Sequence, residues 1–251
     1  QSFAQVTNPP IDSIRERSVM SLHKYLGSEE NLLSKSPTLN IALSIESPVL
    51  SPREVNKILD MSNVFNCVKV ICHCKTSTDL DRKIKRIRRL VEKLVLSGAR
   101  IIFLSDEDLK TGYVPIPMPI IVSAVHHHLI DKGIRNKVSL ICSTGSVVEE
   151  HHIAVLMALG ASAIYPYVAY EIIREYYNKD NWVEKMGNYR YALEKGLLKI
   201  MSKMGISTVS SYHGSMLLHS IGLGSKLSKK YFPSISSKLG GIEINEIMQI
   251  M

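Results

Sequence analysis

Short apolar runs alternate with amphipathic stretches over the first two thirds of the chain. Runs with the composition of buried strands occur at residues 66–72, 100–105, 138–142 and 162–165. Between them, apolar residues at helical spacing predict helices over residues 80–96, from about Pro119, and over residues 147–159. These strand and helix units recur about every 30 residues, as in parallel sheets with right-handed crossovers. The pattern therefore favours an α/β fold, and the units are too few for a complete barrel. We expect an incomplete barrel or an open sheet.

Two helix starts are predicted before the first of these strands. Ser51-Pro52-Arg53-Glu54 combines an N-cap serine, a proline at the first helical position and the glutamate of a capping box. Near the N-terminus, Asn8-Pro9-Pro10 predicts extended backbone, because proline fixes φ and disfavours helix at the residue before it. Asp12 or Ser13 would then cap a helix that ends at Gly27.

The pattern changes after Tyr165-Pro166-Tyr167. A helical C-terminal portion is predicted, with helices over residues 169–177, 189–204, 213–221 and from 242, and a strand at 206–209. The polar residues 178–181 are the best candidate for a linker. We therefore expect two units, residues 1–177 and residues 178–251.

Composition narrows the class of protein. The chain has 251 residues, of which 45% are hydrophobic, and can bury a substantial core. Its longest apolar runs, residues 119–125 and 153–159, are too short to cross a bilayer, and no signal peptide is visible. Four cysteines, placed on predicted strands, are expected to be buried free thiols, which favours a reducing cytoplasm: Cys67, Cys72, Cys74 and Cys142.

The net charge of +8 raises the question of a nucleic-acid partner. Much of the excess lies at residues 82–89, where apolar residues at helical spacing leave the basic residues on the opposite face. A solvated helix face is the favoured interpretation, because no recognised nucleic-acid-binding motif accompanies it.

Histidine and cysteine clusters raise the question of a metal. On a strand, Cys72 and Cys74 share one face and His73 points to the other, and no second ligand pair has zinc-site spacing. His126-His127-His128 fan around a helix, and neither they nor His151-His152 offer two histidines four positions apart. A site between those two helices remains an alternative to core hydrogen bonding and surface exposure.

Two loops lie where α/β enzymes place their chemistry, at the carboxyl ends of strands. Asp106-Glu107-Asp108 supplies carboxylates there, although a solvated acidic loop explains it equally well. Ser143-Thr144-Gly145-Ser146 could hold a phosphate on backbone amides, but a helix-capping turn is favoured because no phosphate-binding fingerprint is complete. We assign no catalytic, cofactor-binding or metal-binding residue.

Ordered segments along nearly the whole chain resemble the large subunit of glutamate synthase, from its central domain into the start of its FMN-binding domain. They are Phe3 to Asp12, Arg15-Glu16-Arg17, Val19 to Leu22, Asn31-Leu32-Leu33, Ser47 to Ser51, Ser123 to Ile130, Lys137 to Leu140, His151-His152 and Gly196 to Thr208.

The resemblance implies an α/β central domain without flavin, which acts as scaffold and ammonia-tunnel wall. In such an enzyme, glutamine and 2-oxoglutarate are converted reductively to two glutamates. The amidotransferase nucleophile, the FMN barrel, the iron-sulfur cluster and the electron-donor subunit would be partners outside this chain, which is expected to be inactive alone. Three positions depart from the family pattern: Glu107 and His213 replace common arginines, and Tyr165 replaces an asparagine.

Two other functions remain open from the sequence. One is a stand-alone α/β protein that binds a small anion near Asp106 and Gly145. The other, less favoured, is a nucleic-acid-binding accessory that uses the helix containing Arg82 to Arg89.

Overall fold

The centre of the protein is a parallel sheet of four strands in the order β3-β5-β7-β8. The computed structural model describes residues 17–29, 42–76, 79–177 and 181–250. The strands are β3 (Cys67–Ile71), β5 (Ile101–Ser105), β7 (Ser139–Ser143) and β8 (Ala163–Tyr165). Sequential strands are neighbours and all three pairings are parallel, which confirms the predicted β-α units.

The alternation of side chains along these strands builds two cores. Val70, Leu104, Cys142 and Ile164 are paired across the sheet and belong to the larger core. Their neighbours in the next row, including Phe103, Ile141 and Ala163, face the opposite side and belong to the smaller core. Because β5 and β7 are buried on both faces, their sequences are continuous apolar runs rather than alternating ones.

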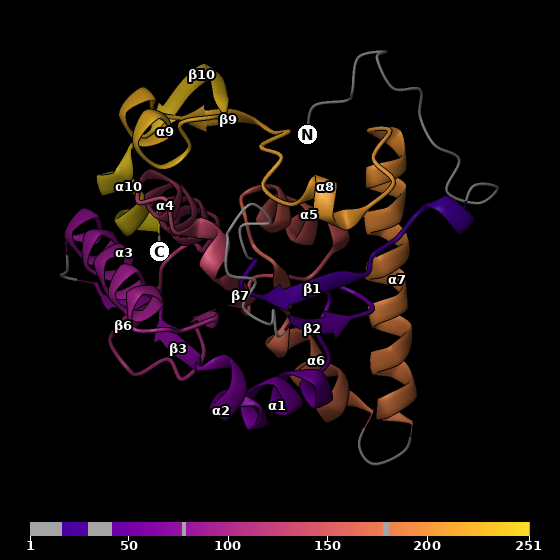
Figure 1. Cartoon of the computed structure of the whole chain (residues 1–251). Coiled ribbons are helices and arrows are strands. Elements are labelled where there is room, and N and C mark those ends of the chain that lie inside the picture. Colours follow the sequence, from indigo (N-terminus) through magenta and orange to yellow (C-terminus); the bar gives the residue numbers. More distant parts are fainter. Residues whose placement is uncertain (1–16, 30–41, 77–78, 178–180, 251) are drawn as a thin grey trace, which may run out of the picture.

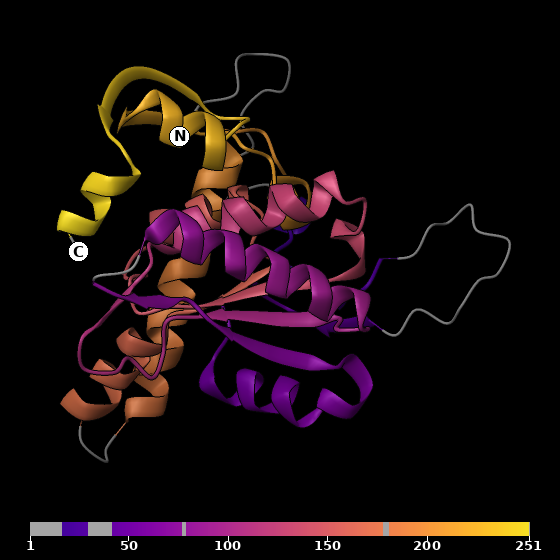
Figure 2. The same cartoon turned by 90° about the vertical axis from the view of Figure 1, so that its left-hand side faces the viewer.

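Different elements cover the two faces of the sheet (Figure 2). The helices that connect the strands, α3 (Leu80–Leu96), α4 (Met118–Asp131) and α5 (Glu150–Ala158), pack on the larger core. The other face is covered by α1 (Pro52–Asp60), α2 (Ser62–Phe65) and the antiparallel pair β1 (Lys24–Gly27) and β2 (Ala42–Ile45). Crossover helices lie outside a barrel, so the second set of elements occupies the side that a closed barrel would turn inward.

Smaller pairings protect the sheet at two places. β4 (His73–Lys75) pairs antiparallel with β6 (Tyr113–Pro115) beyond the end of β3. At the opposite edge, Val49 pairs with Ile164 of β8, and the amide of Leu50 donates to the Ile164 carbonyl oxygen over 2.8 Å. This contact leaves less of the β8 edge open for another strand.

The C-terminal portion is mainly helical, as predicted. It contains α6 (Tyr167–Tyr176), the long α7 (Trp182–Lys203), α8 (Val209–Tyr212), α9 (Ser225–Tyr231) and α10 (Ile244–Ile250). Helix α7 lies against α5 and α6, and the C-terminal elements lie beside α3 and α4 (Figure 1). Strands β9 (His219–Leu223) and β10 (Ser236–Ile242) pair in parallel and are connected through α9. This small sheet was not predicted.

In the centre of the chain, helices α1 and α3 begin where the sequence predicted. The capping box of Ser51 and Glu54 is formed, with both reciprocal hydrogen bonds, and α3 has the predicted bounds. Helix α5 begins at Glu150 rather than Val147, because the residues before it form a loop at the sheet edge. No helix within the described ranges combines the length and apolarity that a membrane span requires.

Three predictions at the ends of the chain are wrong. The helix that was to end at Gly27 is absent from residues 17–27. Instead, Arg17–Val19 form a short 3-10 turn and β1 pairs with β2, which covers the sheet. Residues 206–209 make only one bridge, between Thr208 and Ser21, before α8 begins. The helix over 213–221 is broken by left-handed backbone at Gly214 and Met216.

Some of the predicted features lie outside the described residues. They include the extended segment at Asn8-Pro9-Pro10, its caps Asp12 and Ser13, and the resemblance segments Phe3 to Asp12 and Asn31-Leu32-Leu33.

A partly buried arginine joins four segments at the amino end of the sheet. Arg135 donates from Nε to His126 Nδ1 (2.9 Å), from Nη1 to the Val138 carbonyl (2.7 Å) and from Nη2 to the Gly160 carbonyl (2.8 Å). His213 Nε2 lies 3.2 Å from the same Nη2. These partners belong to α4, to the lead into β7, to the α5-β8 turn and to the C-terminal portion. Within the described part of the chain, no carboxylate lies at ion-pair distance from Arg135.

Gly160 makes this arrangement sterically feasible. Its φ is +111°, and a Cβ atom at this position would overlap the ring of His126. Both the backbone conformation and the space therefore require glycine.

The buried histidines of this cluster resist protonation. Burial, followed by the charge of Arg135, lowers the pKa of His126 to about 3. Burial, followed by Lys24 and Arg135, lowers the pKa of His213 well below its usual range. At neutral pH the cluster therefore combines two neutral rings with the Arg135 cation. Lys24 lies close enough to influence His213, and burial lowers the pKa of Lys24 to about 7.

We predict that Gly160→Ala lowers the free energy of unfolding by about 3 kcal/mol, from left-handed strain plus overlap with His126. Gly133→Ala is the matched control, because Gly133 also has a positive φ (+66°) but open space around it. Its expected cost is about 1 kcal/mol. Urea unfolding of both variants measures the difference, and equal costs would contradict a packed cluster at Gly160.

We also predict that the protein loses stability between pH 7 and pH 5. An unfolded histidine takes up a proton below a pKa of about 6.5, whereas folded His126 does not. Protons therefore favour unfolding, by about 2 kcal/mol for His126 over this interval. His126→Asn keeps an acceptor for Arg135 and should remove about that part of the pH dependence. The exposed His151→Asn variant should keep the pH dependence of the unsubstituted chain, and an identical slope for His126→Asn would refute the assignment.

Candidate functional site

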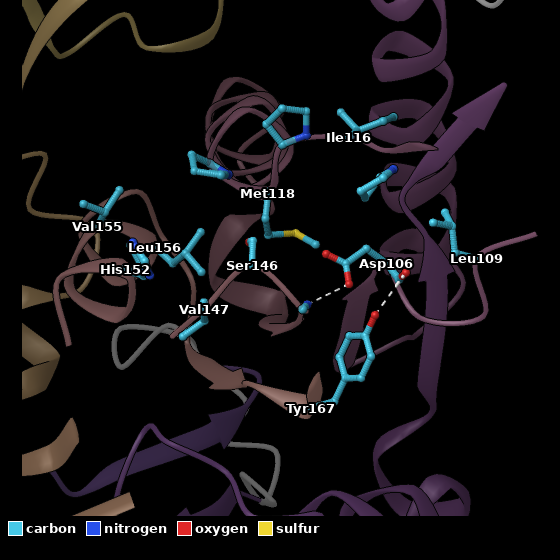
Figure 3. Close-up of a pocket in the computed structure, with 14 residues that line it drawn as sticks. Asp106, Leu109, Ile116, Met118, Ser146, Val147, His152, Val155, Leu156 and Tyr167 are labelled. Atoms are coloured by element: carbon cyan, nitrogen blue, oxygen red, sulfur yellow. Dashed lines mark hydrogen bonds between the residues drawn. The ribbon is translucent and has the colours of Figure 1, made fainter. Parts of the chain in front are cut away.

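A cavity of about 650 Å³ lies at the carboxyl ends of β5 and β7 (Figure 3). Most of its wall is apolar, with Leu109, Ile116, Met118, Val147, Val155 and Leu156 among the lining side chains. Its polar groups come from Asp106, Ser146, His152 and Tyr167. The cavity is therefore at the edge where α/β proteins place ligands, and it joins the two loops that the sequence singled out.

Asp106 organises this edge of the sheet. Its side chain is only 6% exposed. Oδ1 accepts a hydrogen bond from the amide of Gly145 (3.0 Å), and Oδ2 accepts one from the hydroxyl of Thr144. In Figure 3 the carboxylate is directed towards Met118, with Tyr167 beside it. Asp106 thus takes the place at the Thr144-Gly145 loop that an external anion would need.

Gly145 allows the neighbouring helix to approach this loop. A Cβ atom at Gly145 would lie 2.7 Å from Val168 Cγ2 and 3.3 Å from the hydroxyl of Tyr167. The glycine is therefore explained by close packing against the start of α6. Burial, followed by the charge of Asp106, raises the pKa of Tyr167, so its phenol stays protonated at neutral pH.

The other two carboxylates of the acidic loop have different partners. Glu107 accepts from Lys69 Nζ (2.9 Å) and from the hydroxyl of Ser143, and Asp108 accepts from Lys69 (3.1 Å). Glu107 therefore links the ends of β3, β5 and β7. Since these groups are partly exposed, the ion pairs add little stability and mainly fix the loop.

The cysteines behave as core residues. All four are free thiols, and Cys72, Cys74 and Cys142 are buried as predicted, whereas Cys67 is half-buried. Burial raises the pKa of Cys72 to about 12 and raises that of Cys142 well above its ordinary value. Neither thiol is activated as a nucleophile, because the thiolate is the reactive form.

The three consecutive histidines of α4 have three separate partners. His126 joins Arg135, His127 Nδ1 donates to the Ser123 carbonyl oxygen (2.9 Å), and His128 Nε2 lies 2.7 Å from Glu92. His151 and His152 stand at the exposed start of α5. The described residues contain no group of three His, Cys, Asp or Glu side chains arranged to hold a metal ion.

The basic helix has the amphipathic form that the sequence predicted. Ile84, Ile87 and Val91 of α3 are buried, while Arg82, Lys85, Arg86, Arg89 and Lys93 are exposed. A solvated outer face accounts for these charges.

Two features of the molecule were missed from the sequence. Arg135 carried no local signal, because its partners lie in four separate segments of the chain. The cavity had one weak signal, the alternating prolines Pro115, Pro117 and Pro119, all of which line it.

The cavity does not fit FMN, the cofactor that the resemblance implies for the complete enzyme. FMN carries a phosphate, which proteins hold with cationic side chains or free backbone amides. The described lining residues include no lysine or arginine, and the Gly145 amide already donates to Asp106. A phosphate here would meet a buried carboxylate instead of a cation.

Comparison of the sequence with known proteins identifies relatives among the glutamate synthases. Residues 1–224 match the model of the glutamate synthase central domain. The chain is 38% identical to the ferredoxin-dependent glutamate synthase of Pyropia yezoensis over 270 residues, covering 98% of this chain. It is 39% identical to the glutamate synthase [NADPH] large chain of Azospirillum brasilense over 256 residues, covering 99% of this chain. The chain spans 17% of the length of each of these relatives.

The similarity of this chain to solved structures is weaker than its sequence similarity to the glutamate synthases. The flavin-binding domain of baker's yeast flavocytochrome b2 gives a TM-score of 0.45 at 13% identity, over 66% of this chain and 38% of that one. No conclusion about function follows from that level of similarity. The family match covers most of the sequence, and the chain belongs to the glutamate synthase central-domain family.

Proposed function

We propose that this chain is a structural part of a glutamate synthase. Its role is to hold the amidotransferase and FMN-binding modules at a fixed separation and to form part of the wall along which ammonia passes between them. The complete enzyme would convert glutamine and 2-oxoglutarate to two glutamates. The chain spans only 12–17% of the length of its glutamate synthase relatives, which supports a role as one part among several.

The observation that carries this proposal is the chemistry of the cavity at the carboxyl edge of the sheet. An enzyme of this architecture would place its nucleophile, base or cofactor cradle there. In this chain the described residues at that edge are apolar or are engaged in holding the loops together. These residues are better suited to a structural role than to catalysis.

The packing of the molecule supports a rigid spacer. The sheet is covered on both faces, and Arg135 joins four segments at its amino end. Helix α7 has 22 residues, so its axis extends over roughly 33 Å. It packs along α5 and α6 and would transmit position between modules at its two ends.

We further propose the division of the chain that the sequence suggested. Residues 1–177 would form the central domain, and residues 178–251 would form a linker and the leading edge of the FMN-binding domain. FMN, the iron-sulfur cluster and the electron-donor subunit would then belong to partner domains or subunits. The match to the central-domain family extends to residue 224, beyond the proposed boundary at residue 177.

The proposal predicts the behaviour of a chimera. This chain would replace the corresponding segment of the Azospirillum large chain, either unsubstituted or with Asp106→Asn, His152→Gln and Tyr167→Phe together. Because none of these side chains is proposed to act in catalysis, the folded triple variant should keep glutamine-dependent glutamate formation within about threefold of the unsubstituted chimera. Removal of a general acid or base would instead cost about 10²-fold to 10⁴-fold.

Both chimeras are first compared for folded yield, which separates assembly from catalysis. Released ammonia is measured alongside glutamate, because a damaged tunnel wall would leak ammonia before it reaches the synthase site. A loss of about 100-fold or more in the correctly folded triple variant would show that the segment carries catalytic groups.

A further inference from the structure

Asp106 is a buried carboxylate whose protein partners are all neutral. Its two side-chain hydrogen bonds come from the Gly145 amide and the Thr144 hydroxyl. Among the residues that the structure describes, no Lys, Arg or His nitrogen lies within ion-pair distance of it, since Lys69 is paired with Glu107 and Asp108. Burying a carboxylate without a cation is costly, and a cationic ligand would remove that cost.

The cavity gives such a ligand access to the carboxylate. Asp106 lines the cavity together with Tyr167, and Figure 3 shows the carboxylate turned towards its interior. The face of a tyrosine ring also attracts cations. Asp106 is the one carboxylate among the described lining residues, and Figure 3 shows His152 away from it, beside Val155 and Leu156.

The rest of the cavity suits an apolar stem. Leu109, Met118, Val155 and Leu156 contribute hydrocarbon and thioether surface. A volume of about 650 Å³ is in the range of small-molecule sites. The shape and polarity together describe a ligand with one charged end and one apolar end.

We propose that this cavity binds a small primary amine whose ammonium group pairs with Asp106 and whose apolar stem fills the hydrophobic wall. The proposed ligand is therefore a cation, whereas the sequence of the two loops suggested a small anion as the alternative ligand. The inference does not depend on the proposed structural role, because a binding site can be present with or without catalysis elsewhere.

Calorimetric titration of the 251-residue chain with three compounds of matched size tests this site. The probes are 4-phenylbutylamine, 4-phenylbutanol and 4-phenylbutanoate at neutral pH. The amine should bind in saturable fashion, the alcohol about tenfold or more weakly, and the carboxylate not measurably, because only the amine completes the charge pair. Equal affinity for amine and alcohol, or no saturable binding of the amine, would overturn the proposal.

Two substitutions in the acidic loop test which carboxylate pairs with the ammonium group of the ligand. Asp106→Asn should reduce amine affinity to that of the alcohol. Asp108→Asn is the matched control, because Asp108 is exposed and outside the cavity lining but its removal changes the net charge equally. The control should keep the preference for the amine, and a preference that survives Asp106→Asn would refute the role of this carboxylate.

A third variant keeps the test decisive if Asp106→Asn does not fold. Val155→Trp fills the cavity from α5 and leaves Asp106 in place. It should abolish binding of both amine and alcohol while the circular dichroism spectrum stays that of the unsubstituted chain. Unchanged amine binding in this folded variant would place the ligand elsewhere and contradict the proposal.

Discussion

Both faces of the central parallel sheet must be covered, and this constraint governs the whole molecule. Strands β5 and β7 are buried along their full length and mostly apolar, so neither face can remain in water. Crossover helices cover one face. On the other, Leu26 of β1, Ile45 of β2 and Ile58 of α1 fill the space that a closed barrel would fill with its own strands. The open arrangement is stable because these segments complete the second core.

The two ends of the sheet then take different roles. At the amino end, Arg135 collects acceptors from four segments and fixes how the helices and the C-terminal portion sit. At the carboxyl end, Asp106 and Glu107 hold the loops after β5 and β7. Their negative charge makes this edge unsuited to a phosphate and suited to a cation. The chain belongs to the glutamate synthase central-domain family, and this edge chemistry is what the proposed structural role rests on.

Capping motifs and hydrophobic periodicity predicted the helices and strands in the centre of the chain well, because these elements are determined by residues close together in the sequence. The Ser51 to Glu54 capping box, the bounds of α3 and the strand positions follow from residues a few positions apart. The predictions for the two ends of the chain were wrong because tertiary contacts determine the structure there. Residues 24–27 pair with β2 instead of forming a helix, and left-handed backbone at Gly214 interrupts the helix predicted over residues 213–221. The loops at Asp106 and Gly145 were recognised as a place for chemistry. Their mutual hydrogen bond, which reverses the expected sign of the ligand, depends on a contact between residues 39 positions apart.

Under the proposed function, this chain would be part of a flavin enzyme, although the carboxyl edge of its own sheet is unsuited to the flavin phosphate. The most direct measurement is titration of FMN with the purified chain, followed by flavin fluorescence and by flavin absorbance after gel filtration. The account predicts unchanged fluorescence and no flavin eluting with the protein, because the Gly145 amide already donates to Asp106 and the described lining residues include no lysine or arginine. Saturable binding of one FMN per chain would contradict it.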